Sequence, residues 1–189
     1  MDKKYVTTGL RRDAGGVYRA VAGTTLPTDS TTSLASAFKE QGFISEDGMT
    51  KSHSRDTVEL KDMNGVPIRV IKSSETATIQ LKALEVLNIE TIKTVYGDDN
   101  VTGTLTNGLT VKDKPAYQPV ESVWAIDLIS LEGDLTRLVI PRGMITDLGD
   151  EVYKYDEALA FDMTLTCLPD SSGVSIYEYD KVGTGGTTN

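Results

Sequence analysis

Short runs of alternating apolar and polar residues, separated by turn signals, restrict the possible folds of this chain more than any other feature of its sequence. The alternation is clearest in four stretches, which read VYRAVAG, TVELKDMNGVPIRVIKS, TATIQLKAL and FDMTLTC. Alternation of this kind places every second side chain on one face of a strand. Strand runs joined by tight turns favour an antiparallel sheet, so we expect a mainly β fold, a sandwich or barrel.

One hairpin can be predicted together with its turn. Val58 and Leu60 alternate with polar neighbours, Asn64-Gly65 is a strong turn signal, and the strand resumes over residues 67–71. Pro67 has no backbone N–H, so we expect it at the start or edge of a strand. The next strand, residues 76–84, should point four side chains inward: Ala77, Ile79, Leu81 and Ala83.

One helix is predicted over residues 88–96. Asn88 is a favoured N-cap, and Gly97 is placed to end the helix. Leu87 and Ile92 occupy the positions of a hydrophobic staple. An apolar stripe at helical spacing consists of Ile89, Ile92, Val95 and Tyr96. So short a helix does not persist alone, so we expect the stripe to dock on the sheet.

The remaining segments are less regular. A second short helix is expected in residues 33–42, with Leu34, Ala37 and Phe38 on one face. Residues 44–56 are almost all polar and are expected to form a mobile loop, or a hairpin closed by Asp47-Gly48. Further strands are expected near residues 109–111, 122–133, 134–149, 159–170 and 174–180. The whole amounts to eight or nine strands and two short helices.

The charge balance argues against a protein that grips nucleic acid. The chain has 28 acidic and 19 basic residues, a formal charge of −9, whereas phosphate binding needs a basic patch. No apolar run approaches the roughly 18 residues of a membrane helix. The basic start lacks a following apolar stretch, so we expect no secretory signal and folding in a cytoplasm.

No catalytic or metal-binding set is apparent, and we expect no enzymatic activity, no cofactor and no metal site. Cys167 is in phase with the apolar face of its strand and is expected to be a buried hydrophobic residue. The single histidine, His53, lies in a polar stretch and is expected to be solvated. A zinc site needs about four ligands of a kind that this chain does not supply in the usual sets.

Several weaker motifs have simpler interpretations. Residues 98–100 read Asp-Asp-Asn but lack the ligand spacing of a calcium loop, so a polar turn is expected. The GTGG sequence near the end follows no buried strand, as a phosphate loop would, and is expected to be a linker. Acidic neighbours such as Asp147 with Asp150 are expected at the solvated surface. The tyrosines Tyr177 and Tyr179 share one strand face, either as a ligand platform or as a sheet contact.

Two stretches carry a family resemblance. They read GGVYRAVAGTTLPTDSTTSLASAFKEQGFISEDGMT (15–50) and ALEVLNIETIKTVYGDDNVTGT (83–104). Their order and turns resemble the major tail protein, or tail tube protein, of bacteriophages with long non-contractile tails. The later stretches RLVIPRGMITDLG and YDEALAFDMTLTCLPDSSG resemble the closing strands of that family. The resemblance covers residues 15–180.

The resemblance implies a tail-tube fold, an antiparallel β-sandwich or barrel flanked by one helix. It implies hexameric rings of identical copies that stack into a virion tube, through which DNA passes without specific binding. Tail tip or initiator, tape measure and tail terminator proteins are the implied partners, with no membrane involved. We expect a flexible N-terminal arm (1–15), a tail-tube domain (16–180) and a flexible C-terminal tail (181–189).

Two other functions remain open from the sequence. A carbohydrate- or receptor-binding β-sandwich would need an exposed aromatic cluster with convergent polar groups. A carboxylate-based hydrolase would need a pocket with two opposed acids.

Overall fold

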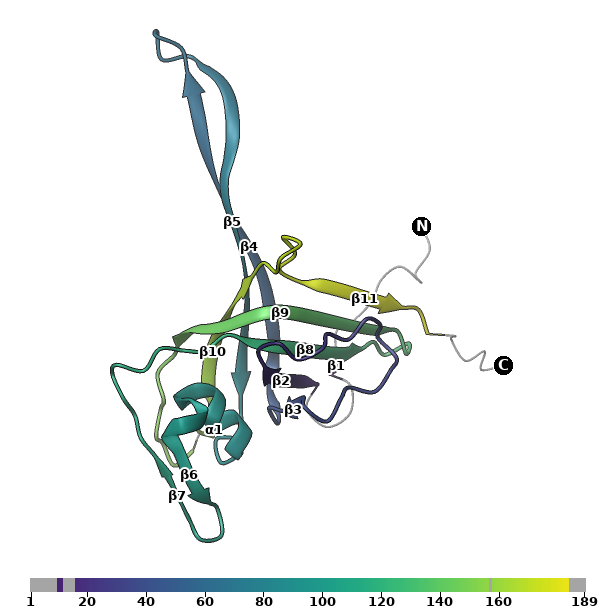
Figure 1. The fold of residues 1–189 in the computed structure, drawn as a ribbon, viewed down its shortest axis with the longest axis vertical. Coiled ribbons are helices and arrows are strands. Elements are labelled where there is room, and N and C mark those ends of the chain that lie inside the picture. Colours follow the sequence, from purple (N-terminus) through teal and green to yellow (C-terminus); the bar gives the residue numbers. More distant parts are fainter. Residues whose placement is uncertain (1–9, 12–15, 157, 184–189) are drawn as a thin grey trace.

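Most strands of this protein are hydrogen-bonded into one large antiparallel sheet. The computed structural model describes residues 10–11, 16–156 and 158–183. Within them a nine-stranded sheet runs in the order β3-β2-β8-β9-β10-β5-β4, with β1 beside β8 and β11 beside β9 (Figure 1). The strands of this sheet are β1 (Leu10–Arg11), β2 (Val17–Val21), β3 (Lys39–Glu40), β4 (Ile44–Lys61), β5 (Pro67–Ala83), β8 (Ser122–Ile129), β9 (Leu135–Leu148), β10 (Phe161–Leu168) and β11 (Tyr177–Lys181).

Smaller elements lie at one end of this sheet. They are the helix α1 (Ile89–Tyr96), the 3-10 turn η2 (Asp98–Asn100) and the two-stranded sheet of β6 (Val101–Thr104) and β7 (Gly108–Val111). The predicted class, mainly β and antiparallel with a flanking helix, is therefore confirmed.

The sheet branches along its central strand, β9. The first part of β9, from Leu135 to Val139, pairs with β11, and the second part, from Arg142 to Leu148, pairs with β10. On its other edge β9 forms a hairpin with β8. The branch turns β10, β5 and β4 away from β8 and β11, and Figure 1 shows these strands crossing the others at a steep angle.

Trp124 on β8 lies at the centre of the core and is 1% exposed. Gly143 on β9 makes room for the indole, because a Cβ atom there would lie 2.6 Å from Trp124 Cδ1. The predicted inward face of residues 77–83 is confirmed, since its four apolar side chains are buried in the same cluster as Trp124. Cys167 is buried there too, as predicted.

The predicted helix is confirmed, and polar contacts fix its position. The Asn88 side chain accepts a hydrogen bond from Glu90 N at 3.0 Å, and Gly97 ends the helix with φ +92°. Ile92 and Val95 enter the core. Leu87 is 67% exposed, so the predicted staple does not bury it. Instead, the hydroxyl groups of two buried threonines donate to Gln41: Thr91 to its main-chain oxygen and Thr94 to its side-chain oxygen.

The helix predicted at residues 33–42 is wrong. The segment contains a turn at residues 36–37 and the short strand β3, and it forms no helix. Its place in the fold is set by Arg137, whose Nη1 donates to the main-chain oxygens of Asp29 (2.9 Å) and Thr32 (2.8 Å). Arg137 is itself buried against Asp127 at 2.6 Å. These tertiary bonds hold residues 22–38 as an irregular loop and override a weak helix propensity.

The loop predicted at residues 44–56 is also wrong. These residues form the first part of β4, and Asp47-Gly48 lies in an irregularity between Ile44 and Met49 and does not close a hairpin. The segment is polar because most of this part of β4 is exposed to solvent, not because it lacks regular structure. His53 is exposed as predicted, but on this strand.

Candidate assembly interface

The most unusual feature of the molecule is a long hairpin that leaves the body. It consists of the outer part of β4, the connecting turn and the first part of β5; we call residues 51–76 the projecting hairpin. Its strands pair from Ser54 with Thr76 out to Lys61 with Pro67, while residues 51–53 pair with residues 77–79 of the body. Every residue from 51 to 76 is exposed. Figure 1 shows the hairpin extending along the longest axis of the molecule, with no other element beside its outer half.

The turn at the tip is well defined. Asp62 Oδ1 accepts hydrogen bonds from Asn64 N (2.9 Å) and Val66 N (2.8 Å). Gly65 has φ +79°, a conformation that glycine adopts without steric cost. The predicted Asn64-Gly65 turn is confirmed, as is Pro67 at the start of its strand.

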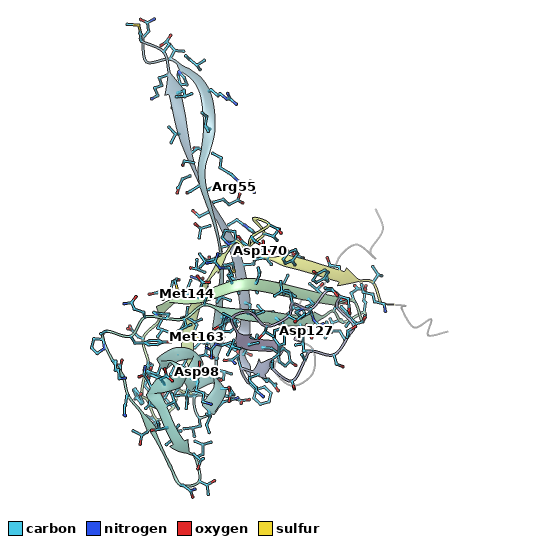
Figure 2. All side chains as sticks on the ribbon, viewed as in Figure 1. Arg55, Asp98, Asp127, Met144, Met163 and Asp170 are labelled. Carbon is cyan, nitrogen blue, oxygen red and sulfur yellow. The ribbon has the colours of Figure 1, made fainter. Side chains whose placement is uncertain are left out.

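Aliphatic side chains stand on both faces of the projecting hairpin (Figure 2). Residues that pair directly across an antiparallel ladder point to the same side. Val58 opposite Ile71 and Leu60 opposite Arg69 therefore share one face, which we call the Leu60 face. Val70 and Ile68 lie on the other. The five aliphatic residues of these two faces are 41–70% exposed, and Met63 at the tip is fully exposed.

An isolated two-stranded hairpin is at best marginally stable in water, and contiguous exposed apolar surface marks an interaction site. The projecting hairpin combines both features. Its unpaired outer edges also offer backbone N–H and C=O groups to another chain. The arrangement is suited to binding a protein surface.

Charged contacts orient the hairpin where it leaves the body. Glu75 accepts hydrogen bonds from Lys72 Nζ (2.7 Å) and Arg55 Nε (2.9 Å). These contacts, that of Lys72 first, lower the pKa of Glu75 from 4.5 to about 2. Lys51 Nζ lies 2.6 Å from Glu178 Oε2 on β11. The root of the hairpin is thus linked to the neighbouring branch of the sheet.

The residues weighed from sequence for catalysis are not brought together. Burial raises the pKa of the Cys167 thiol to about 12, which makes it a poor nucleophile. His53 Nδ1 lies 3.8 Å from Glu75 Oε1 at the hairpin root. Asp147 and Asp150 are exposed at the surface. Over the described parts of the chain, no group of three His, Cys, Asp or Glu side chains is arranged to hold a metal ion.

The other motifs have structural roles. Asp98 pairs with Arg19 at 3.0 Å, and the buried Asn100 side chain donates to the main-chain oxygen of Tyr96 at 2.7 Å. Tyr177 and Tyr179 stack with ring centroids 6.4 Å apart. Most of the GTGG motif, residues 184–186, lies outside the described residues. Among the residues that are described, no helix has the length and apolar character of a membrane span.

The tip of this hairpin was predicted from the sequence, but its length and its separation from the body were not. The available signal was a polar strand, residues 50–56, leading into a strand pair with aliphatic residues on both faces. A hairpin packed on its own core would be expected to show a polar face.

Comparisons with known proteins give a matching family and several similar solved structures. A family profile described as "Phage tail tube protein" matches residues 6–179. No curated protein matches the chain. Three solved structures are similar in fold at low sequence identity. The first is titled "Tail of empty GTA particle computed with helical refinement, C6 symmetry" (11% identity, 70% of this chain and 82% of the other, TM-score 0.40).

The other two structures are also large assemblies. One is titled "Virion of native gene transfer agent (GTA) particle" (11% identity, 78% of this chain and 92% of the other, TM-score 0.40). The other is titled "Cryo-EM Structure of an Extracellular Contractile Injection System, PVC sheath-tube complex in extended state" (12% identity, 94% of this chain and 93% of the other, TM-score 0.47).

Proposed function

The chain belongs to the phage tail tube protein family, and on that premise we propose that its copies assemble by themselves into stacked rings held together by the projecting hairpin. It is a structural protein of the virion tail. In the assembly, each copy contributes a rigid body and one hairpin that reaches a neighbouring copy. The protein acts through these contacts and carries out no chemical reaction.

The observation that carries this proposal is the exposure of residues 51–76. A standard protein interface uses roughly 20–30 residues on each side, and this hairpin alone offers surface of that extent. Its aliphatic side chains are solvated in the single chain and become buried when a partner covers them. The exposure is accounted for if the working state of the protein is an assembly and the single chain is its building block.

The tube is proposed to be a conduit for DNA. The net charge of −9 suits a lumen that does not bind phosphate, because an acidic wall repels the DNA backbone. Six copies per ring are expected from the family resemblance. The tail tip or initiator, tape measure and tail terminator proteins are proposed partners at the ends and inside the tube.

The two ends of the chain are proposed to become ordered on assembly. The proposed domain spans residues 16–180, with an N-terminal arm of residues 1–15 and a tail of residues 181–189. Most residues of both end segments lie outside the described residues. Leu10 and Arg11 pair with β8, which supports a strand-like role for this arm at the edge of the sheet.

The test is a variant with a shorter hairpin. Removing residues 57–61 and 67–72 joins the turn at Asp62–Val66 to the inner part of the hairpin, next to the Asp56–Ser74 pair. Purified protein is concentrated, and tubes are counted by negative-stain electron microscopy. The full-length chain should form tubes. The shortened chain should remain monomeric and retain the melting temperature of the full-length monomer.

A matched pair of substitutions controls for loss of surface aliphatic groups in general. Val58→Ser with Val70→Ser changes the hairpin, and Val21→Ser with Val182→Ser changes two similarly exposed valines of the body. The hairpin pair should reduce tube formation more than the body pair. Tubes of normal length from the shortened chain, or a full-length chain that is monomeric at every concentration, would contradict the proposal.

A further inference from the structure

The surface that receives the projecting hairpin can be identified at the opposite end of the molecule. A shallow groove of about 470 Å³ is lined by six residues. We call it the leucine groove, and its residues are Leu84, Glu85, Val86, Leu87, Asn88 and Leu105. Its three leucines are exposed. It lies where β5 leads into α1 and beside the β6–β7 turn, whereas the hairpin tip lies at the other end of the longest axis (Figure 1).

The leucine groove contains one carboxylate that is held in place without a cation. Glu85 Oε1 accepts a hydrogen bond from Phe43 N at 3.0 Å, and Oε2 accepts one from Asn88 Nδ2 at 3.1 Å. The side chain packs over Gly42, where a Cβ atom would lie 2.5 Å from the carboxyl carbon. Within the described part of the chain, Glu85 has no Lys, Arg or His partner. The groove therefore presents apolar walls and one fixed negative charge.

The Leu60 face of the hairpin has the complementary composition. Val58, Leu60 and Ile71 form an aliphatic strip, and Arg69 opposite Leu60 is the charged residue among them. No ion pair of Arg69 with another described residue is formed. The charged neighbours Lys61 and Lys72, by contrast, pair with Glu59 and Glu75. The face therefore presents aliphatic side chains and one uncompensated positive charge.

We propose that the Leu60 face of one copy docks in the leucine groove of the next copy, with Arg69 pairing with Glu85. The inference rests on the proposed function, since it names the partner surface of the same hairpin. The hairpin and the groove lie at opposite ends of one chain, so they meet only between copies. Head-to-tail contacts of this kind repeat along an axis without closing, as the stacking of rings requires.

The occupant of the groove is a second copy and not another protein, because the Leu60 face matches the groove in apolar character and carries the opposite charge. Every copy carries both surfaces at equal concentration. Arg69 and Glu85 have no oppositely charged partner among the described residues and gain one in the complex, and desolvating the pair beside leucines strengthens their attraction. Three leucines alone would accept many apolar partners, and the fixed carboxylate selects one that carries a cation.

Cross-linking tests the geometry. A chain with Leu60→Cys and Leu87→Cys is assembled and treated with a short bis-maleimide, and the products are separated on a denaturing gel. A ladder of multimers is expected, because each copy links to the next. The native Cys167 is buried with a raised pKa and stays unreacted. The matched control pairs Leu60→Cys with Leu131→Cys, which is at least as accessible at the β8–β9 turn, and should give no ladder.

A double-mutant cycle tests the ion pair. Arg69→Gln and Glu85→Gln remove each charge with little change in side-chain length, and the amide oxygen introduced by Glu85→Gln can still accept from Phe43 N. Each single variant should raise the critical concentration for assembly by about 5- to 10-fold, and the double variant should raise it no further. Lys61→Gln, on the opposite face of the hairpin, should change it by less than about twofold.

The outcomes separate this inference from the proposed function. If the shortened hairpin abolishes tubes but the Leu60–Leu87 ladder is absent, the hairpin docks elsewhere and the inference is overturned while the proposed function stands. Strictly additive effects of Arg69→Gln and Glu85→Gln would also overturn it. If tubes form without the hairpin, the proposed function fails, and the inference fails with it.

Discussion

The two halves of β5 show how one strand can serve two different purposes. From Ala77 to Ala83 every second side chain is buried and belongs to the core around Trp124. From Pro67 to Thr76 no side chain is buried, although aliphatic residues continue. The inner half stabilises the single chain. The outer half is paired with β4 but buries no side chain in the single chain, and we propose that its aliphatic residues stabilise the contact with another copy.

Aliphatic side chains are buried in the body but exposed in the hairpin, so apolar content alone does not identify the core. A buried aliphatic side chain contributes about 1.5–3 kcal/mol relative to an exposed one. The aliphatic residues of the projecting hairpin lack that contribution in the single chain. If these side chains are buried in the tube, their burial contributes to the free energy of assembly and not to the stability of the monomer.

The largest loss of stability is expected from a substitution at the centre of the body. Trp124→Ala removes the largest buried side chain and should lower the free energy of unfolding by about 3–5 kcal/mol, measured by urea denaturation of the monomer. A cost below about 1 kcal/mol would show that the body tolerates a large cavity. The distinction between a tightly packed body and a hairpin that adds no buried side chains to the monomer would then be incorrect.

A matched pair of substitutions compares the two regions with identical chemistry. Val139 on β9 is fully buried, and Val70 on the hairpin is well exposed. Threonine has nearly the same shape as valine but adds a hydroxyl group. Val139→Thr should cost about 1–3 kcal/mol, because the hydroxyl is buried without a ready partner.

The same change in the hairpin, Val70→Thr, should alter the free energy of unfolding by less than about 0.5 kcal/mol. Both values come from denaturation of the monomer under the same conditions. Equal losses of stability at the two positions would mean that the hairpin is packed in the free chain. The distinction between a packed body and an unpacked hairpin would then be wrong.

The smallest effect is expected at the junction of the two regions. Lys72 and Arg55 lower the pKa of Glu75 to about 2 from its ordinary 4.5, so their contacts favour the folded hairpin root when Glu75 is ionised. This contribution is fully present above about pH 4.5 and is lost as the pH falls through about 2. The group is exposed, so the effect is small and screened by salt.

Amide hydrogen exchange at residues 53–57 and 72–76, corrected for the intrinsic pH dependence of exchange, measures this change. Protection should fall between pH 4.5 and 2, and Glu75→Gln should remove the fall. An unchanged pH dependence in Glu75→Gln would show that other acids control the root of the hairpin.

Much of the body could be predicted from sequence because burial imposes a pattern. Residues 77–83 and 161–167 alternate since one face of each strand meets the core, and the helix after Asn88 has both of its end signals. The family resemblance is confirmed by the profile over residues 6–179. These features are local or depend on a single buried face.

The failures have a common physical origin in long-range contacts. The helix predicted at residues 33–42 does not form because Arg137, about a hundred residues further on, binds the main chain of the preceding loop. Residues 44–56 were predicted as a loop because they are polar. A strand that is exposed to solvent is equally polar, so composition could not distinguish the two. The hairpin could be predicted from Asn64-Gly65, but not its separation from the body, because the alternation does not reveal which chain covers a strand.

Hydrogen–deuterium exchange can compare the projecting hairpin in the monomer and in assembled tubes of the same protein. We expect rapid exchange of the amides of residues 57–61 and 67–72 in the monomer and strong protection of the same amides in assembled tubes. Amides of β8 and β9 should be protected in both. Protection of the hairpin in the monomer, or continued rapid exchange of the hairpin in tubes, would contradict the claim that this hairpin acts by joining copies of the chain.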